Sequence, residues 1–274
     1  MTGSQKQVIV AGSFDNMRSR QVRFLEEASK LGPVTCLLWS DGACRRLEGK
    51  APHFPEAERM YFLRNLRFVT DVKLIDAGAG FHTVPVSEIG QAQCWAVDAS
   101  SDHPDKKAFC AANKLGYRVF RDEELKGFPE QPAQPTPGRK KVMVTGCYDW
   151  FHSGHVRFFE EVSTYGDLYV VVGHDANIKL LKGEGHPLLP EAERRYMCGS
   201  VRFVTQALVS SGEGWLDAEP EIKRIKPDIY AVNEDGDKGG KRAYCEKLGI
   251  EFLVLKRTPA PGLPKRSSTD LRGF

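Results

Sequence analysis

The chain carries the same pattern twice, in the same order and at a nearly constant offset. The matching blocks are residues 8–15 with 142–149, 22–27 with 156–161, 55–59 with 190–194, 67–70 with 202–205, and 108–116 with 243–249. Collinear blocks at one spacing are the signature of a duplicated structural unit. The sequence therefore predicts two units of one fold within its 274 residues.

A proline-rich segment separates the two copies. It covers residues 128–139, and its apolar residues show no period of a helix or a strand. Such composition is typical of a semi-extended linker. We therefore expect a first domain over residues 1–127, a linker over 128–139 and a second domain over 140–274.

Apolar strands and amphipathic helices alternate along each copy. In the second copy the patterns predict strands over 141–145, 168–172, 229–232 and 251–255, and helices after His155 and over 190–201, 214–225 and 242–248. This alternation indicates an α/β fold with a doubly wound parallel sheet. In such sheets ligands bind at the carboxyl ends of the strands.

The bulk composition excludes several classes of protein. Net charge is +3 without a run of Lys or Arg, so we expect no nucleic-acid partner. We find no stretch of 18 consecutive apolar residues and no signal peptide, so we expect no membrane span. The seven cysteines include no C-x-x-C pair. Reduced thiols and a cytoplasmic location are the simplest expectation.

The segment with the clearest chemistry is Gly146-Cys147-Tyr148-Asp149-Trp150-Phe151-His152-Ser153-Gly154-His155. It connects a predicted strand to a predicted helix and places two histidines three residues apart. A helix N-terminus presents free backbone N–H groups and a positive dipole end to an anion. The alternatives are structural histidines and a zinc site of Cys147, His152 and His155 without an evident fourth ligand.

This segment resembles the G-x-[FY]-D-x-x-H-x-G-H signature of the cytidylyltransferase group of nucleotidyltransferases. The resemblance implies two tandem Rossmann-like nucleotidyltransferase domains and covers nearly the whole second copy. It implies that His152 and His155 contact the phosphates as catalytic residues. It also places Gly146, Cys147, Tyr148 and Gly154 at the nucleotide and Asp149 at the acceptor substrate.

Two further motifs fit the resemblance. Leu181-Lys182-Gly183 matches a Lys-Gly whose lysine contacts the triphosphate, and Asp175 matches an acidic position beside the acceptor. Residues 190–196 resemble a helix whose arginine, here Arg194, reaches the nucleotide. The alternatives are a solvated loop lysine and a surface ion pair of Arg194 with Glu191.

The C-terminal segment 266–273 resembles the family's R-T-x-G-[IV]-S-[ST]-T-x-[IL] element, with Ser267 at the nucleotide and Ser268 and Thr269 among the catalytic residues. The hydroxyls are also simply good helix caps. Because residues 259–265 lengthen the connection, either Arg257 or Arg266 can supply the arginine, and we favour Arg257. We also assign Asn233 and Asp235 to the nucleotide and Trp215 to the acceptor, although 233–237 also reads as a turn and Trp215 as a cover for the core.

The first copy lacks this chemistry. Arg18, Arg20 and Gln21 replace His152, Gly154 and His155, and residues 121–124 replace the Ser-Thr element. We expect a degenerate domain that serves packing or dimer formation, or that binds an anion through Arg18 and Arg20. Tandem copies with one degraded site resemble the layout of ethanolamine-phosphate cytidylyltransferases, in which the other copy is the degraded one.

The resemblance implies that the chain is an enzyme releasing pyrophosphate from a nucleoside triphosphate. We expect CTP and a phosphorylated alcohol as substrates, with Mg²⁺ bound to the phosphates and no metal ligated directly by protein. Phosphoethanolamine, glycerol 3-phosphate or a sugar phosphate are candidate acceptors. The alternatives are an adenylyltransferase acting on a sugar phosphate and a non-catalytic nucleotide-binding regulator. A homodimer is possible on the family pattern.

Overall fold

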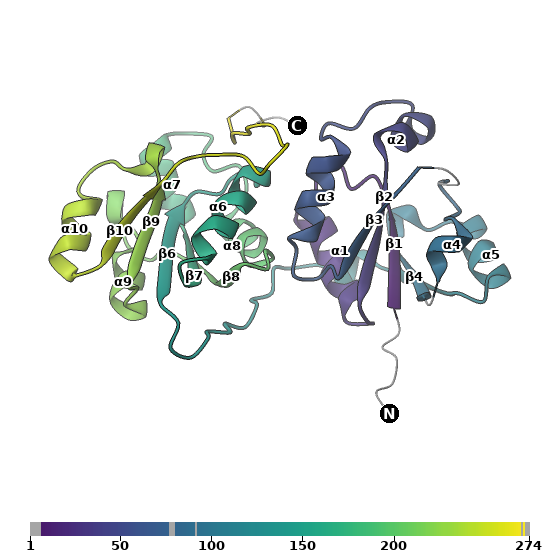
Figure 1. Ribbon diagram of the computed structural model, residues 1–274, viewed down its shortest axis with the longest axis horizontal. Helices are drawn as coiled ribbons and strands as arrows, with labels where there is room; N and C mark the ends of the chain where they lie inside the picture. Colours follow the sequence, from purple (N-terminus) through teal and green to yellow (C-terminus); the bar gives the residue numbers. More distant parts are fainter. Residues whose placement is uncertain (1–6, 77–79, 91, 270, 272–274) are drawn as a thin grey trace. The chain divides into compact units, whose positions relative to one another are not determined.

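The computed structural model describes residues 7–76, 80–90, 92–269 and 271. The chain divides into two compact units, Met1–Gly127 and Phe128–Phe274 (Figure 1). Among the described residues no helix has the length and apolar character needed to cross a bilayer.

The second unit is built on a five-stranded sheet in the order β10-β9-β6-β7-β8, with every pair parallel. Its strands are β6 (Lys141–Gly146), β7 (Asp167–Val172), β8 (Val204–Val209), β9 (Ile229–Asn233) and β10 (Glu251–Leu255). Its helices are α6 (Ser153–Ser163), α7 (Asp175–Lys182), α8 (Glu191–Gly199), α9 (Glu219–Ile225) and α10 (Lys241–Leu248), with 3₁₀ turns η3 (Gly214–Leu216) and η4 (Glu234–Gly236).

The first unit has the corresponding order, β3-β2-β1-β4-β5. Its strands are β1 (Gln7–Gly12), β2 (Val34–Trp39), β3 (Asp71–Ile75), β4 (Ala92–Asp98) and β5 (Gly116–Phe120). Its helices are α1 (Ser19–Ser29), α2 (Asp41–Glu48), α3 (Glu56–Arg64), α4 (Val86–Ile89) and α5 (Pro104–Ala112), with 3₁₀ turns η1 (Ala99–Ser101) and η2 (Asp122–Leu125). The predicted fold class, doubly wound parallel α/β sheets, is confirmed.

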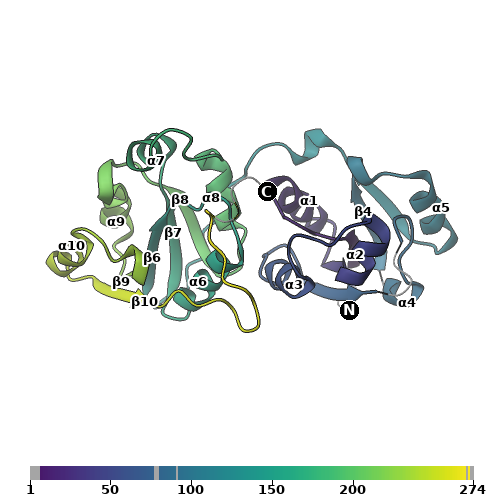
Figure 2. The same ribbon diagram turned by 90° about the horizontal axis from the view of Figure 1, so that it is seen from above.

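Helices cover both faces of the second sheet (Figures 1 and 2). Side chains of α9 and α10, among them Ile222 and Cys245, pack on alternate strand residues such as Met143 and Tyr230. The helices α6 and α8 lie on the opposite face. Burial on both faces explains why β6 and β7 read as continuous apolar runs in the sequence.

Two elements of the second unit differ from the sequence prediction. The expected helix over 214–225 is divided into η3 and α9, because Pro220 occupies the first turn of α9, where its missing N–H is tolerated. The helix α7 and the strand β8 were not predicted. In α7, Leu180 and Leu181 are exposed, so the apolar periodicity that would mark a buried helix face is weak.

The proline-rich segment contains no helix or strand, and it packs on the second unit. The Arg195 guanidinium donates to the Phe128 carbonyl at 2.7 Å, and the rings of Phe128 and Tyr196 lie 5.8 Å apart. At its other end, the Thr136 N–H donates to the buried Asp167 carboxylate. These contacts make residues 128–139 part of the second compact unit.

The turn after the first strand has the same unusual backbone in both units. Tyr148 and Trp150 have φ values of 53° and 47°, and the corresponding Phe14 and Asn16 both have 49°. The left-handed region costs about 1 kcal/mol or more for a residue with a side chain. Neighbouring contacts must therefore hold this turn in each unit.

A buried arginine supplies part of that support in the second unit. Arg194 of α8 is 0% exposed. Its guanidinium donates to the Cys147 carbonyl at 2.6 Å, the Gly173 carbonyl at 2.7 Å, the Leu189 carbonyl at 2.9 Å and the Asp175 carboxylate at 2.7 Å. One side chain thus joins the ends of β6 and β7, the start of α7 and the loop before α8.

Arg59 of α3 makes the equivalent contacts in the first unit. It donates to the carbonyls of Phe54, Ser13 and Trp39 and to the carboxylate of Asp41. Because the first unit lacks both histidines but keeps this network, the arginine serves the fold rather than the chemistry. Bonds from a charged donor to otherwise unpaired carbonyls are among the stronger hydrogen bonds in proteins.

We expect Arg194→Ala to lower the free energy of unfolding of the second unit by about 3 kcal/mol, because it leaves three carbonyls without a donor and opens a cavity. Urea unfolding followed by circular dichroism measures the change. Arg224→Ala, on an exposed position of α9, is the matched control and should cost no more than about 0.5 kcal/mol. Equal effects of the two substitutions would contradict the structural role of Arg194.

Candidate active site

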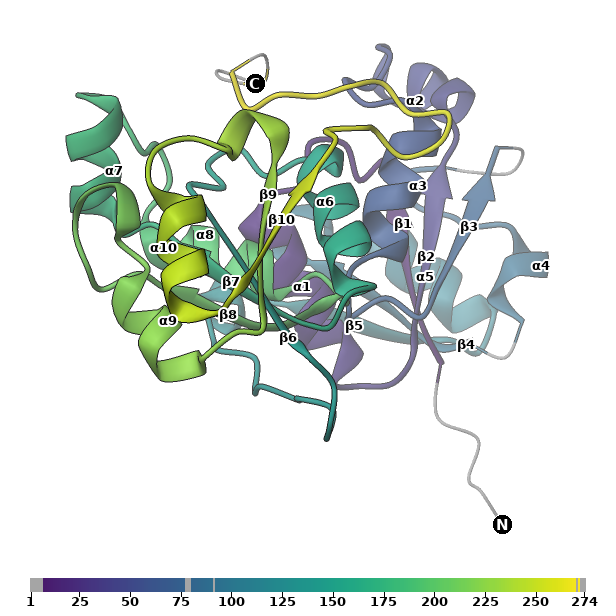
Figure 3. The same ribbon diagram turned by 60° about the vertical axis from the view of Figure 1, so that its left-hand side comes forward.

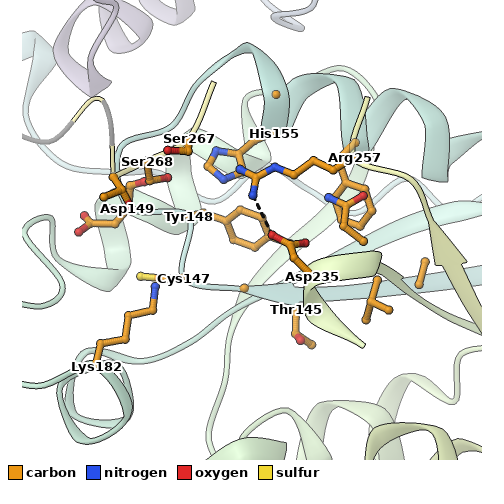
Figure 4. Close-up of a pocket in the computed structure, with 18 of the residues that line it drawn as sticks. Thr145, Cys147, Tyr148, Asp149, His155, Lys182, Asp235, Arg257, Ser267 and Ser268 are labelled. Carbon is orange, nitrogen blue, oxygen red and sulfur yellow. Dashed lines mark hydrogen bonds and ion pairs between the residues drawn. The ribbon is translucent and has the colours of Figure 1, made fainter. Parts of the chain in front are cut away.

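A polar cavity of about 300 Å³ lies at the carboxyl ends of β6 and β9, where the strand order of the second sheet reverses (Figure 4). Figure 3 shows the ribbons of β6, β9 and β10 from which the loops around it leave. This is the place where doubly wound sheets bind ligands. Its lining comes from the turn after β6, the first turns of α6, the end of α7, the loop after β9 and the C-terminal segment. The lining residues are Thr145, Gly146, Cys147, Tyr148, Asp149, Gly154, His155, Phe158, Lys182, Ala231, Val232, Asn233, Asp235, Gly236, Lys241, Arg257, Ser267, Ser268 and Thr269.

Both histidines of the motif lie at the N-terminus of α6. His152 is the N-cap, and its Nδ1 accepts the Gly154 N–H at 3.0 Å. Its ring stacks on that of His155, with centroids 3.9 Å apart. His152 is 3% exposed, whereas His155 lines the cavity. His152 therefore caps the helix and packs on one face of the His155 ring, and His155 is the histidine of the pair that lines the cavity.

The His155 imidazole is held neutral. Burial against Phe151 and Tyr148, whose ring centroids each lie 5.3 Å away, lowers its pKa well below the usual value, and the charges of His152, Arg257 and Lys182 add to the effect. A neutral imidazole still donates one hydrogen bond to a phosphate oxygen. Because its surroundings are cationic, the arrival of an anion would raise this pKa again.

Two glycines of the motif are required by close contacts. A Cβ on Gly146 would come within 2.8 Å of the Tyr148 ring, and one on Gly154 within 2.9 Å of the His152 ring. In the first unit, a Cβ on Gly12 would meet nothing within 4 Å, and Arg20 occupies the position of Gly154. The glycines therefore serve the packing of Tyr148 and His152 beside the cavity.

Cationic side chains approach the cavity from two sides. Lys182, the last residue of α7, reaches toward Cys147, while Arg257 lies on the opposite side beside His155 (Figure 4). The Arg257 guanidinium pairs with the Asp235 carboxylate at 2.8 Å and donates to the Arg266 carbonyl at 3.3 Å. Of the two candidate arginines, Arg257 is thus the one whose side chain lines the cavity.

The C-terminal segment forms part of the cavity wall. The Ser268 hydroxyl donates to the Asp149 carbonyl at 3.1 Å, and Ser267 and Thr269 line the cavity beside it. Asp270, Arg272 and Gly273 of the predicted motif lie outside the described residues. The contact of Ser268 ties the end of the chain to the turn after β6.

Several predicted site residues take other places. Among the described residues that line the cavity, His152, Arg194, Asp175 and Trp215 do not occur. Asp175 is the ion-pair partner of Arg194 rather than a free carboxylate. Trp215 is 51% exposed, and its ring lies against Gly240.

Asp149 lines the cavity, but its carboxylate is already engaged. One oxygen accepts the Leu188 N–H at 2.9 Å and the other accepts the Leu189 N–H at 3.0 Å. The equivalent Asp15 accepts from His53 and Phe54 in the first unit. Asp149 therefore orients the loop before α8, and its contact with the acceptor substrate stays a prediction.

The sequence prediction missed Lys241 at the start of α10. It lines the cavity, and burial lowers its pKa. A lysine in the first turn of a helix opposes the helix dipole, and this departure from the usual pattern is a signal by which the sequence could have identified Lys241. Lys106 occupies the matching position in the first unit.

Two alternative predictions find no support in the described part of the chain. Cys147, His152 and His155 do not bring ligand atoms within 4.8 Å of one another, as a zinc site requires. In the first unit, Arg20 pairs with Asp122 at 2.6 Å and lies 3.9 Å from Asp98. Acidic neighbours occupy this guanidinium, so an anion site built on Arg20 is disfavoured.

We expect His155 to stay neutral in the free protein at pH 6.5, where an ordinary imidazole is half protonated. Proton NMR of the histidine ring signals tests this, with His155→Gln used to assign the resonance. Because the unfolded chain binds the proton more readily, the free energy of unfolding of the second unit should fall as the pH drops below about 6.5. An ordinary titration of His155 near pH 6.5 would contradict this electrostatic account.

The comparisons with known proteins agree with the geometry of the second unit. Residues 143–273 match the cytidylyltransferase-like family. The chain is 36% identical over 120 residues to an FAD synthase of Ferroglobus placidus, spanning 43% of this chain and 75% of that protein. An FAD synthase of Pyrococcus horikoshii is 37% identical over 120 residues, spanning 42% of this chain and 78% of that protein.

The bifunctional protein HldE of Aliarcobacter butzleri is 32% identical over 120 residues, which are 43% of this chain and 24% of that protein. Among solved structures, the lipopolysaccharide core biosynthesis protein of Thermoplasma volcanium aligns with a TM-score of 0.37 and 25% identity, over 45% of this chain and 99% of that one. With the motif-bearing turn at the end of β6 and the matched region covering the cavity, the chain belongs to the cytidylyltransferase-like nucleotidyltransferase family.

Proposed function

We propose that the second unit transfers a nucleotidyl group from a nucleoside triphosphate to a phosphorylated acceptor. An oxygen of the acceptor phosphate attacks the α-phosphorus, the bond from that phosphorus to the β-bridging oxygen breaks, and pyrophosphate leaves with the electron pair. The observation that carries the proposal is one cavity lined by His155, Lys182 and Arg257 at a helix N-terminus. Donors and cations fixed in advance stabilise charge on the phosphoryl oxygens.

The side chains divide this work by position. His155 donates to an oxygen of the α-phosphate as a neutral imidazole, so it adds no charge that would hold the product. Lys182 and Arg257, on opposite sides of the cavity, neutralise the β- and γ-phosphates and the departing pyrophosphate. In this scheme His152 is a positioning residue that acts through His155.

Mg²⁺ would enter with the nucleotide. Among the described residues of the lining, Asp149 and Asp235 carry carboxylates, and both oxygens of Asp149 accept backbone N–H groups. This part of the lining therefore offers one carboxylate that is not held by backbone N–H groups, which suits an ion that prefers phosphate oxygens and water. Release of Arg257 from Asp235 would free both groups, the cation for phosphate and the anion for Mg²⁺ or ribose.

We favour ATP as the donor, because several relatives at 31–37% identity bear the name FAD synthase, and FAD contains an adenylyl group. CTP is the second candidate, supported by the signature of the turn after β6. The acceptor carries a phosphate that attacks the donor. FMN, sugar phosphates, glycerol 3-phosphate and phosphoethanolamine represent the chemical range to be tested.

A pyrophosphate-release assay with Mg²⁺ tests the proposal, with ATP and CTP each offered against this acceptor panel. We expect release that requires both a nucleotide and one acceptor, and that is faster with ATP. Faster release with CTP would select the second candidate. Tight nucleotide binding without release for any acceptor would instead support a binding-only regulator.

We expect Lys182→Met to lower kcat/KM by about 100-fold or more, the usual effect of removing a group that stabilises transition-state charge. Lys179→Met is the matched control, because Lys179 lies on the same helix but pairs with Glu184 at 3.0 Å. It should change kcat/KM by less than about 3-fold. Equal losses for the two variants would place the triphosphate elsewhere.

A further inference from the structure

The first unit has a second polar cavity, of about 390 Å³, at the carboxyl ends of its strands. Its walls include Ser13 after β1, Trp39 at the end of β2 and Lys106 of α5. Trp39 is only 7% exposed, and its indole N–H has no acceptor among the described residues. A buried donor without a partner costs about 1–3 kcal/mol, so a water or another polar group in the cavity would be stabilised beside this N–H.

Two histidines and an aspartate meet at the rim of this cavity. His82 lies in the loop between β3 and α4, and His103 is the N-cap of α5. Their rings stack with centroids 3.8 Å apart. His82, His103 and Asp105 bring one ligand atom each within 4.8 Å of one another, the one such group of histidine, cysteine and acidic residues in the described part of the chain.

The contacts of these side chains suit a metal ion. The distance from His103 Nδ1 to the Asp105 carboxylate is 3.5 Å, close to the separation of about 3.4 Å between ligands on a tetrahedral ion with bonds of about 2.1 Å. His82 Nδ1 is buried and has no hydrogen-bond partner in the described residues. The ion would displace only the 3.2 Å bond from the Asp105 N–H to His103 Nδ1.

The surrounding charge also favours a cation. Glu48 and Asp102 line the cavity, against the single cation Lys106. Lys106 donates to the Ser101 carbonyl at 2.7 Å, which satisfies part of its hydrogen-bonding capacity. Imidazole nitrogens with one carboxylate select borderline ions such as Zn²⁺ over Mg²⁺ or Ca²⁺, which prefer oxygen ligands.

We propose that the first unit binds one divalent transition-metal ion of the zinc type through His82, His103 and Asp105. Water or a polar ligand within the cavity completes the coordination, next to the unpaired N–H of Trp39. The two imidazoles are nearly parallel, with an interplanar angle of 11°, so their lone pairs now run side by side. Binding one ion requires both rings to rotate out of the stack until the lone pairs converge. The ion joins the loop after β3 to the start of α5, so it also stabilises the first unit.

Calorimetric titration of chelator-treated full-length protein with Zn²⁺, in excess Mg²⁺, tests the proposal. We expect one ion per chain, with binding weakened about 10-fold or more by His82→Ala or His103→Ala, and also by Asp105→Asn. Asp105 is exposed, so the last variant keeps the fold intact. Co²⁺ should bind at the same site without the charge-transfer band that a thiolate ligand gives.

Two controls separate this site from other candidates. His53→Ala removes an exposed histidine of the same unit, and Cys147→Ser removes the thiol of the second cavity. Both should bind Zn²⁺ as the unmodified protein does. Full binding in His103→Ala and Asp105→Asn, loss of binding in Cys147→Ser, or no saturable Zn²⁺ binding would each overturn the proposal.

Discussion

The buried guanidinium of Arg194 holds together the part of the second unit on which its chemistry depends. It joins the carbonyls at the ends of β6 and β7 to the start of α7 and the loop before α8. The left-handed turn that carries Tyr148 follows β6 directly. Without a donor for these carbonyls, the turn would lose the support that offsets its backbone strain, and α6 would lose its fixed starting point.

Comparison of the two units distinguishes the residues that maintain the fold from those specific to the cavity of the second unit. Both keep the buried arginine, the left-handed turn, and an aspartate that accepts two backbone N–H groups, Asp149 in one and Asp15 in the other. The second unit keeps the histidines, and there a Cβ on Gly146 would come within 2.8 Å of Tyr148, whereas one on the corresponding Gly12 would meet nothing within 4 Å. The first unit instead has two histidines and an aspartate at the rim of its own cavity. The two units therefore share a fold and differ in the side chains that their cavities offer to a ligand.

Much of this arrangement could be predicted from the sequence, because repetition and the alternation of strands and helices fix the topology. The gathering of His155, Lys182, Arg257 and Ser268 around one cavity followed from the family motif. The motif does not distinguish the residues that line the cavity from those that support its walls. Arg194, Asp175 and His152 belong to it, yet they do not line the cavity and instead contact other parts of the second unit, which only the three-dimensional structure reveals.

The elements and residues that the sequence prediction missed were missed for physical reasons. The helix α7 exposes Leu180 and Leu181 and so lacks the pattern of a buried face. Lys241 belongs to no recognised motif and reaches the cavity because η4 and the loop after it bring α10 to the end of β9. His82 and His103 are separated by twenty residues in the sequence. They meet because all strands of the first sheet are parallel, so that the loops after β3 and β4 leave from the same carboxyl edge.

The central claim is that the cavity of the second unit receives the triphosphate, and a crystal structure with a non-hydrolysable nucleoside triphosphate and Mg²⁺ tests it most directly. The account predicts an α-phosphate within hydrogen-bond distance of His155, with the β- and γ-phosphates between Lys182 and Arg257. It also predicts that Arg257 leaves Asp235. A triphosphate bound in the first unit, or one in the second unit that leaves the Arg257–Asp235 pair intact and does not touch His155, would contradict it.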